Sequence, residues 1–136
     1  MADYWLLKSE PGDYSYADLE RDGHAIWDGV RNPAALKHIR QLSAGDQAFF
    51  YHTGKERAVV GIVQVESEAY PDPDAGDERL VVFEVSPLRR LPQPVSLARI
   101  KASEGFESWE LVRVPRLSVM PVPKRLWLEI LSMSEP

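Results

Sequence analysis

Apolar and β-branched residues alternate with polar ones in several short stretches, which is typical of strands. Most of these stretches end near Gly, Pro or Asp, where turns are expected. The pattern predicts strands at residues 4–8, 24–27, 47–52, 58–66, 79–86 and 117–119. The stretch 58–66 carries the strongest signal because most of it is β-branched. Gly61 in its middle predicts a bulge or the close approach of another group.

Four consecutive rings, from Phe49 to His52, occupy the strand predicted at 47–52. Alternation along a strand sends Phe49 and Tyr51 to one side and Phe50 and His52 to the other. We expect one pair to lie in the core and the other to line a surface or a pocket.

Helix-capping residues precede several stretches with a helical period. Ser15, with Asp18 three residues later, predicts a capped helix that ends at Gly23. Asn32 and Pro33 are a favourable start for the next helix. The pattern as a whole predicts helices at residues 15–21, 32–42, 96–103 and 123–133, whereas 108–112 fits no single state.

Prolines divide the second half of the chain. Residues 70–78 contain two Pro and one Gly and are predicted to form a loop. Pro87, Pro92 and Pro94 are predicted to interrupt the chain after the strand at 79–86. Five or six short strands with three or four short helices predict an α+β fold: a small mixed β-barrel or strongly curved sheet with helices packed around it. The lack of regular βαβ alternation argues against a Rossmann-type sheet.

Length and composition favour a single domain over residues 1–136, since 44% of the residues are hydrophobic. No apolar run reaches the length that spans a bilayer, and the first residues lack the features of a signal peptide. There are no cysteines, which excludes disulfides and Cys-based zinc sites. We expect a monomer without membrane attachment that is intracellular, cytoplasmic in a bacterium and nuclear in a eukaryote.

The net charge of −5 argues against a nonspecific binder of duplex DNA, which normally has a basic surface. The charge is unevenly distributed, however. Residues 31–65 carry five basic and two acidic side chains, whereas residues 66–88 carry one basic and seven acidic ones. A basic rim around a pocket would be consistent with this distribution, and so would ordinary solvated faces.

Common catalytic and cofactor motifs are missing. The three histidines have no zinc-helix spacing, and the acidic residues at 72–78 lack the spacing of a calcium loop. Neither a phosphate-binding glycine loop nor a nucleophile elbow is present. Paired carboxylates for glycoside hydrolysis stay open, because any acidic protein offers such pairs. We therefore expect no metal, no cofactor and no catalytic residues.

The run WDGVRN at 27–32 combines an indole, a carboxylate, a glycine, a guanidinium and an amide, a mixture that a buried core does not need. Such a mixture suits a pocket that stacks on a flat, nitrogen-rich ligand and hydrogen-bonds its edge. Trp27 could equally be a buried loop anchor, and Asn32 a helix cap. Trp109 and Trp127 stand in apolar helical contexts and are predicted to lie in the core.

Six blocks in order along the chain resemble the EVE domain family: YWLLKSEP at 4–11, WDGVRN at 27–32, GDQAFFYHT at 45–53, VGIVQV at 60–65, AYPDP at 69–73 and RLSV at 116–119. The resemblance covers nearly the whole chain. It implies a PUA-like fold, related to the YTH and ASCH domains. It also implies a non-enzymatic reader of modified bases, such as 5-methylcytosine in DNA, with RNA as the alternative for some members.

Carried over to this chain, the resemblance implies a set of ligand-binding residues. The base would be bound by Trp5, Ser9, Trp27, Asn32, Tyr51, His52, Arg116 and Ser118. Within this set we expect Trp27 and Tyr51 to stack on the base. The nucleic-acid backbone would be contacted by Arg31, Lys37, Arg40 and also Arg116. The chain departs from the family pattern in PAALKHIR at 33–40 and in YHT at 51–53, which bears on ligand identity more than on the fold.

Two other functions are compatible with the same sequence features. The pocket could serve a sensor or an enzyme for a free nucleoside or a similar heterocycle. Alternatively, the acidic segment 66–88 could be the contact surface of a protein-interaction module. The base-reader hypothesis depends on one geometric expectation, which is that the Trp27 indole borders an open hollow with polar walls.

Overall fold

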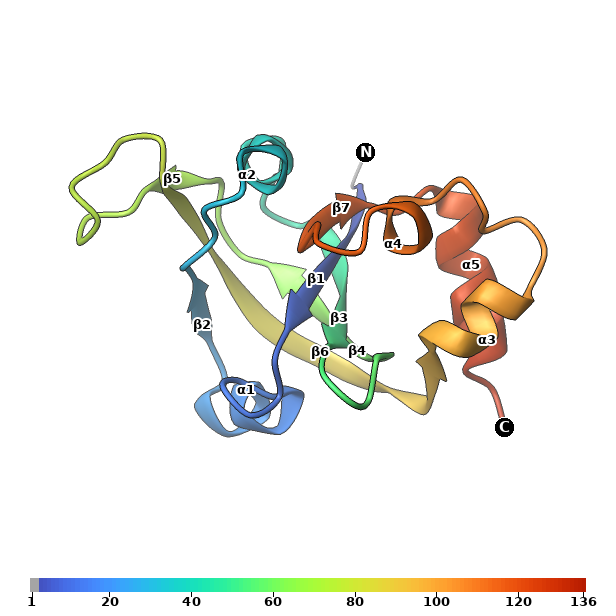
Figure 1. Ribbon diagram of the computed structural model, residues 1–136. Helices are drawn as coiled ribbons and strands as arrows, with labels where there is room; N and C mark the ends of the chain where they lie inside the picture. Colours follow the sequence, from blue (N-terminus) through green and yellow to red (C-terminus); the bar gives the residue numbers. More distant parts are fainter. Residues whose placement is uncertain (1–2) are drawn as a thin grey trace.

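The structure, a computed structural model, describes residues 3–136, and within them it contains seven strands and five helices. Six strands form one curved sheet in the order β2-β6-β4-β3-β1-β7, and β5 pairs with β6 beside this path (Figure 1). β1 and β3 are parallel, and all other pairs are antiparallel. The strands are β1 (Tyr4–Ser9), β2 (Ala25–Trp27), β3 (Gln47–His52), β4 (Ala58–Val65), β5 (Tyr70–Pro71), β6 (Val81–Ser96) and β7 (Val119–Pro121).

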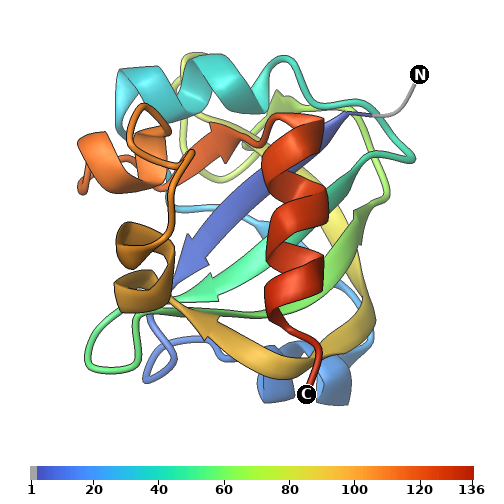
Figure 2. The same ribbon diagram turned by 90° about the vertical axis from the view of Figure 1, so that its right-hand side faces the viewer.

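Short helices surround the sheet. Figure 2 shows the longest of them, α5, lying in front of β1, β3 and β4. The helices are α1 (Tyr16–Asp22), α2 (Pro33–Ile39), α3 (Leu97–Ala102), α4 (Glu110–Arg113) and α5 (Lys124–Met133). The predicted fold class, a curved mixed sheet with short helices packed around it, is therefore confirmed, with one strand and one helix more than expected.

The starts of the first two helices agree with the capping prediction. The Ser15 side chain accepts a hydrogen bond from Asp18 N, and the Asp18 side chain accepts one from Ser15 N, which completes the capping box of α1. Gly23 ends this helix in the left-handed region at φ 74°. Asn32 caps α2, and Pro33 occupies its first turn.

The prediction that prolines interrupt the chain after residue 86 was wrong, since β6 continues through Pro87, Pro92 and Pro94 for 16 residues. Each proline lies where the pairing with β4 is irregular. Leu88 is an extra residue between the pairs that place Pro87 opposite Val63 and Arg89 opposite Ile62, and residues 91–94 all lie opposite Val60. A strand tolerates proline at such bulges because no ladder hydrogen bond is required there.

The expectation that one face of β3 is open was also wrong, because all four rings from Phe49 to His52 are buried. Both faces of this strand are covered. Phe49 stacks on Trp127 of α5 at 3.9 Å between ring centroids, and Phe50 meets Tyr16 of α1 edge-on at 5.3 Å.

Two smaller predictions also needed correction, and one segment without a predicted state is partly helical. Tyr70 and Pro71, at the start of the predicted loop, form β5 against β6. The last strand is shifted from 117–119 to 119–121. The segment 108–112, which fits no single state, overlaps the short helix α4.

The remaining core agrees with the sequence. Trp109 and Trp127 are buried as predicted. Val59, Ile62 and Val63 of β4 are fully buried. No helix within residues 3–136 is long and apolar enough to cross a membrane.

Candidate functional site

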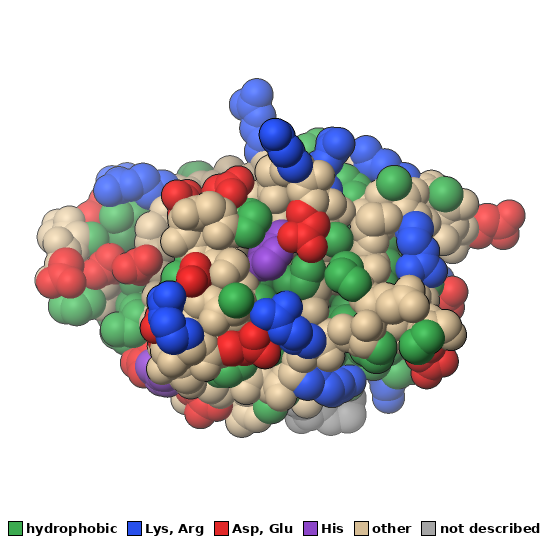
Figure 3. All heavy atoms as spheres, turned by 90° about the horizontal axis from the view of Figure 1, so that it is seen from below, with side chains coloured by type: hydrophobic (Ala, Val, Ile, Leu, Met, Phe, Trp, Pro, Cys, Tyr) green, Lys and Arg blue, Asp and Glu red, His purple; other side chains and the backbone are tan. Residues whose placement is uncertain are grey.

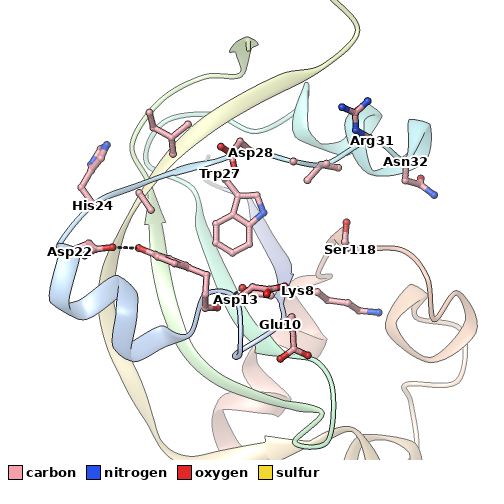
Figure 4. Close-up of a pocket in the computed structure, with 16 residues that line it drawn as sticks. Lys8, Glu10, Asp13, Asp22, His24, Trp27, Asp28, Arg31, Asn32 and Ser118 are labelled. Atoms are coloured by element: carbon pink, nitrogen blue, oxygen red, sulfur yellow. Dashed lines mark hydrogen bonds between the residues drawn. The ribbon is translucent and has the colours of Figure 1, made fainter. Parts of the chain in front are cut away.

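A hollow of about 680 Å³ opens beside Trp27. In Figure 4 the indole stands at its centre, with Ser118 and Lys8 on one side, Asp22 on the other, and Arg31 and Asn32 at the rim. Five segments converge on it: the end of β1 with the following loop, the end of α1, β2, the loop into α2, and the residue before β7. The lining residues are Lys8, Ser9, Glu10, Asp13, Tyr14, Asp22, His24, Ala25, Ile26, Trp27, Asp28, Gly29, Val30, Arg31, Asn32 and Ser118.

The Trp27 ring is held rigidly at the wall of this pocket. Its backbone pairs with Phe83 of β6, and its ring meets Phe50 edge-on, with centroids 5.5 Å apart and planes at 89°. Trp27 is largely buried, with 9% of the residue exposed, and its ring nitrogen has no hydrogen-bond partner among residues 3–136. Trp27 therefore borders an open hollow with polar walls, as the sequence predicted. A fixed ring of this kind can stack on a flat ligand without a large loss of conformational entropy.

The loop after Trp27 brings the polar end of the WDGVRN run to the rim. Gly29 has a φ of 77°, a conformation that side chains with a Cβ rarely adopt, and it turns the chain towards α2. Asn32 Oδ1 accepts hydrogen bonds from Ala34 N at 2.8 Å and Ala35 N at 3.1 Å. The oxygen of this amide is thus used by the helix cap, and only its NH₂ group is available to a ligand.

The wall opposite Ser118 is built from the loop after β1 and from α1. Ser9 Oγ donates a hydrogen bond to the Tyr14 carbonyl, and the Tyr14 hydroxyl donates one to Asp22 Oδ2 at 2.9 Å, drawn as a dashed line in Figure 4. Burial, together with this bond to Asp22, raises the pKa of Tyr14 to about 12. The hydroxyl is therefore protonated at neutral pH and remains a donor in this wall.

Lys8 and Ser118 form the wall on the side of β7. Lys8 N donates to Ser118 O at 2.9 Å, and Lys8 Nζ donates to Pro115 O at 2.8 Å. Burial lowers the pKa of Lys8. The Ser118 hydroxyl has no hydrogen-bond partner within the described chain, so it can both donate to and accept from a ligand.

Acidic side chains outnumber basic ones around the pocket. Its lining contains four carboxylates, from Glu10, Asp13, Asp22 and Asp28, against the two cations Lys8 and Arg31. Gly12 N donates to Glu10, and Asp22 is bound by Tyr14 and Arg21, whereas Asp13 and Asp28 have no side-chain partner within residues 3–136. This balance disfavours a phosphate inside the pocket. It suits a neutral ring with amino groups, because carboxylates accept hydrogen bonds from exocyclic amines.

Six of the eleven residues predicted to contact the ligand or its backbone lie elsewhere, and Trp5 is the clearest case. Its ring is buried, and its Nε1 donates to Asp46 Oδ2 at 2.9 Å. The same carboxylate accepts from Ser43 N and Asp3 N. Trp5 thus anchors the start of β1 to the turn before β3 and does not line the pocket.

Tyr51 and His52 also lie outside the pocket lining. Tyr51 is 3% exposed, with Lys8 Nζ 5.8 Å from its ring centroid. His52 Nε2 accepts a hydrogen bond from Tyr16 N at 3.0 Å, which leaves the proton on Nδ1 to be donated to Glu56 Oε1 at 2.7 Å. Both nitrogens of His52 are therefore used within the protein, and the ring positions α1 against β3.

The predicted cations are divided among different places. Arg31 lies at the rim of the pocket and also lines a neighbouring hollow of about 400 Å³, together with Arg40 and Arg79. Arg40 is tied there by a bond from its guanidinium to Arg79 O at 2.6 Å. Lys37 and Arg116 are exposed and line neither hollow. The predicted residues that the structure gathers at the pocket are Ser9, Trp27, Arg31, Asn32 and Ser118.

Sequence reasoning missed the wall that the loop after β1 and the end of α1 contribute, namely Asp13 and Tyr14 of the loop and Asp22 of α1. The available signal was the position of the loop 10–14, which directly follows the KSEP block and precedes the capped helix. Among residues 3–136 no group of three or more His, Cys, Asp or Glu side chains is arranged to hold a metal ion.

Comparisons with known proteins identify relatives that span almost the whole chain. The family model described as EVE domain matches residues 3–133. Thymocyte nuclear protein 1 of Mus musculus is 31% identical over 169 residues, an alignment that covers 99% of this chain and 75% of the mouse protein.

Solved structures resemble the whole chain. A protein of Agrobacterium tumefaciens has 40% identity and a TM-score of 0.94, covering 98% of this chain and 93% of its own. The human THYN1 protein, solved in complex with 5-methylcytosine containing DNA, has 28% identity and a TM-score of 0.90, covering 99% of both chains.

Proposed function

This chain belongs to the EVE domain family, and from that premise we propose that its Trp27 pocket binds a modified base of the 5-methylcytosine type, presented by a nucleic acid. The observation that carries the proposal is the rigid, ligand-accessible indole of Trp27 at the wall of a hollow of about 680 Å³ with polar walls. The complex of the human THYN1 protein with methylated DNA supports the choice of ligand class.

In this proposal Trp27 supplies the stacking surface. A base has to leave its stack to be inspected, which costs a few kcal/mol, and an aromatic platform returns roughly 1–3 kcal/mol per base. The edge of the base would be bound by Ser9, Asn32 and Ser118, among which the Ser118 hydroxyl has the most freedom. The unpartnered carboxylates of Asp13 and Asp28 add acceptors for an exocyclic amine, which favours cytosine-type or adenine-type bases over thymine and uracil.

Phosphates of the strand would lie outside this acidic pocket. Arg31 and Arg40 offer cations in the neighbouring hollow, and Lys37 and Arg116 offer exposed ones. A fitted slot for one methyl group contributes only about 1–3 kcal/mol to discrimination. We therefore expect a preference of roughly tenfold for the methylated base over unmodified cytosine.

The test is a titration of short single-stranded oligonucleotides that differ only in one central base, 5-methylcytosine or cytosine, at stated low salt. Trp27→Ala should weaken binding of the methylated probe by roughly tenfold or more, in line with the stacking contribution. Trp27→Phe keeps a ring and should lose less. Circular dichroism checks that each variant is folded, because Trp27 also packs against Phe50.

Ser118→Ala removes a hydroxyl that is not bonded within residues 3–136, so this variant should keep its stability and lose affinity. If Trp27→Ala and Ser118→Ala bind both probes as tightly as the parent, the pocket does not bind the base. If the free nucleoside binds as tightly as the oligonucleotide, the pocket is a small-molecule site. This is the alternative function, and the acidic lining favours it because a nucleoside carries no phosphate.

A further inference from the structure

A separate hollow of about 330 Å³ lies between the β3–β4 hairpin and α3. It is lined by Lys55, Glu56, Arg57, Ser96, Leu97, Ala98 and Lys101. Figures 1 and 2 both show this hairpin and α3 close together on the side of the molecule that faces the viewer in Figure 1.

The charge of this second hollow is opposite to that of the Trp27 pocket. Its three cations, Lys55, Arg57 and Lys101, are exposed, and within residues 3–136 their side chains make no hydrogen bond or ion pair. Glu56, the acid in its lining, is hydrogen-bonded to His52 at 2.7 Å. The hollow therefore carries a local excess of positive charge in a chain whose net charge is −5.

The two walls of the second hollow are fixed relative to each other. Leu97 N donates to Arg57 O at 2.8 Å, and Ala58 pairs with Ser96 in the β4–β6 ladder. Arg57 holds a φ of 45°, which is uncommon for a residue with a Cβ. Cations on a backbone that is already ordered pay less entropy when they bind an anion.

The second hollow adjoins the Trp27 pocket through the loop after β1. Thr53 N donates to Ser9 O at 2.9 Å, and Ser9 lines the pocket. Gly54 approaches this loop so closely that an added Cβ would lie 2.8 Å from Glu10 Oε2. The hairpin and the pocket are therefore close enough for one strand to reach both.

Figure 3 looks onto the face that carries α1 and the tip of the hairpin. Lys and Arg side chains gather along its upper edge, whereas acidic side chains lie at its left, over the loop that follows β5. The basic edge thus lies away from the acidic loop after β5, with further acidic side chains just below it.

We propose that the hollow formed by Lys55, Arg57 and Lys101 binds backbone phosphates of the same strand whose modified base occupies the Trp27 pocket. This inference rests on the proposed function for the identity of the strand. The acidic pocket repels phosphate, so the phosphates beside the inserted base must be bound outside it, and ammonium and guanidinium groups are the side chains that do so.

The test compares Lys55→Gln/Lys101→Gln with the control Arg89→Gln/Lys124→Gln, which removes the same net charge from exposed residues outside every hollow described above. Affinity for the methylated single-stranded probe is measured by fluorescence anisotropy over a series of salt concentrations. In Lys55→Gln/Lys101→Gln, called the hollow variant below, the slope of log K against log salt should become shallower by about 1.4. Each phosphate contact on a single strand contributes about 0.7 to the slope, and this variant loses two. The control should keep the parental slope.

Two further probes separate this inference from the proposed function. An abasic site in place of the methylated base removes the ligand of the pocket and keeps the phosphates. The Lys55→Gln/Lys101→Gln variant should bind this probe more weakly than the parent does, whereas Trp27→Ala should bind it as tightly as the parent. The free 5-methylcytosine nucleoside has no phosphodiester, and its affinity should not change in the hollow variant.

Each hypothesis can fail alone. Equal slopes for the hollow variant and the control would overturn the phosphate site, even if the methylated base is preferred. A shallower slope in the hollow variant with no preference for the methylated base would retain the phosphate site and reject the base pocket.

Discussion

His38 on α2 has a ring nitrogen, Nδ1, that is buried without a hydrogen-bond partner in the described chain. Burial lowers the pKa of His38 from its ordinary 6.5, and the charge of Lys37 acts in the same direction, against the opposing effect of Glu110. The ring also lies 6.2 Å from that of Trp5. The folded protein therefore holds His38 neutral at a pH where the unfolded chain has begun to protonate it.

This shift predicts how stability depends on pH. Between 6.5 and the lower folded pKa, the unfolded state binds more protons, so the free energy of unfolding falls as the pH is lowered through this window and then levels off. Urea denaturation of the parent and of His38→Leu at several pH values measures the effect. The difference in stability between the two proteins should change across the window. Parallel curves would show that His38 does not titrate in this way.

Trp5 and Trp27 show how far single residues could be interpreted from the sequence. Trp27 was identified because its neighbours are too polar for a core strand, and that local information was sufficient. Trp5 is followed by Leu6 and Leu7, so its neighbours do not mark it as polar, and its partner is Asp46, which is 41 residues away along the chain. No local pattern reveals such a distant partner. The resemblance alone therefore implied that Trp5 lies in the pocket, whereas its hydrogen bond to Asp46 shows that it holds β1 against the turn before β3.

At the scale of elements, α1 packs on β4 through Tyr16 and Gly61. The Tyr16 ring is fully buried, and its hydroxyl donates to Ile62 O at 2.7 Å. A Cβ on Gly61 would lie between 2.5 and 2.9 Å from three atoms of this ring. The sequence predicted a bulge or a close approach at Gly61, and the structure contains both.

We therefore expect Gly61→Ala to destabilise the protein by about 1–3 kcal/mol, the usual cost of overpacking. The free energy of unfolding in urea is the measurement. In a Tyr16→Leu background the same substitution should cost less, because the clashing ring is gone, and the double-mutant cycle reports this coupling. An equal cost in both backgrounds would mean that Gly61 is required for its backbone conformation and not for the contact.

The helix ends could be predicted from the sequence and the course of the long strand β6 could not, because helix ends depend on nearby residues and the strand depends on a distant partner. The capping of α1 and α2 depends on residues within three positions of the helix start, such as Ser15 and Asn32. The path of β6 through Pro92 and Pro94 depends on Val60 of the opposing strand, which the local sequence does not specify. Local rules for proline thus predicted a break where the neighbouring strand allows a bulge.

At the scale of the whole molecule, β3 separates two layers. Phe50 on one face packs against Trp27 and so supports the wall of the pocket. Phe49 on the other face stacks on Trp127, which also stacks on Tyr4 at 4.3 Å. Strands β1, β3 and β7 and helix α5 therefore join the two ends of the chain in one packed layer. The sequence could not show that β3 is covered on both sides, because the two covers come from distant parts of the chain. Trp127 covers Phe49 from far along the chain, and Tyr16 and Trp27, which precede β3, cover Phe50.

Because the pocket wall and α5 lie on opposite faces of β3, we expect that weakening the packing of α5 leaves the pocket unchanged. Trp127→Ala removes a buried ring from between two others and should cost about 3–5 kcal/mol in the free energy of unfolding. The control is Leu128→Ala on the same helix. Leu128 is 53% exposed, and its substitution should change stability by no more than about 0.5 kcal/mol. At a temperature where circular dichroism shows Trp127→Ala to be folded, its affinity for the methylated probe should equal that of the parent, because the Trp27 wall rests on the opposite face of β3. A folded Trp127→Ala variant with lost affinity would show that the two layers are coupled and that the pocket depends on the whole sheet.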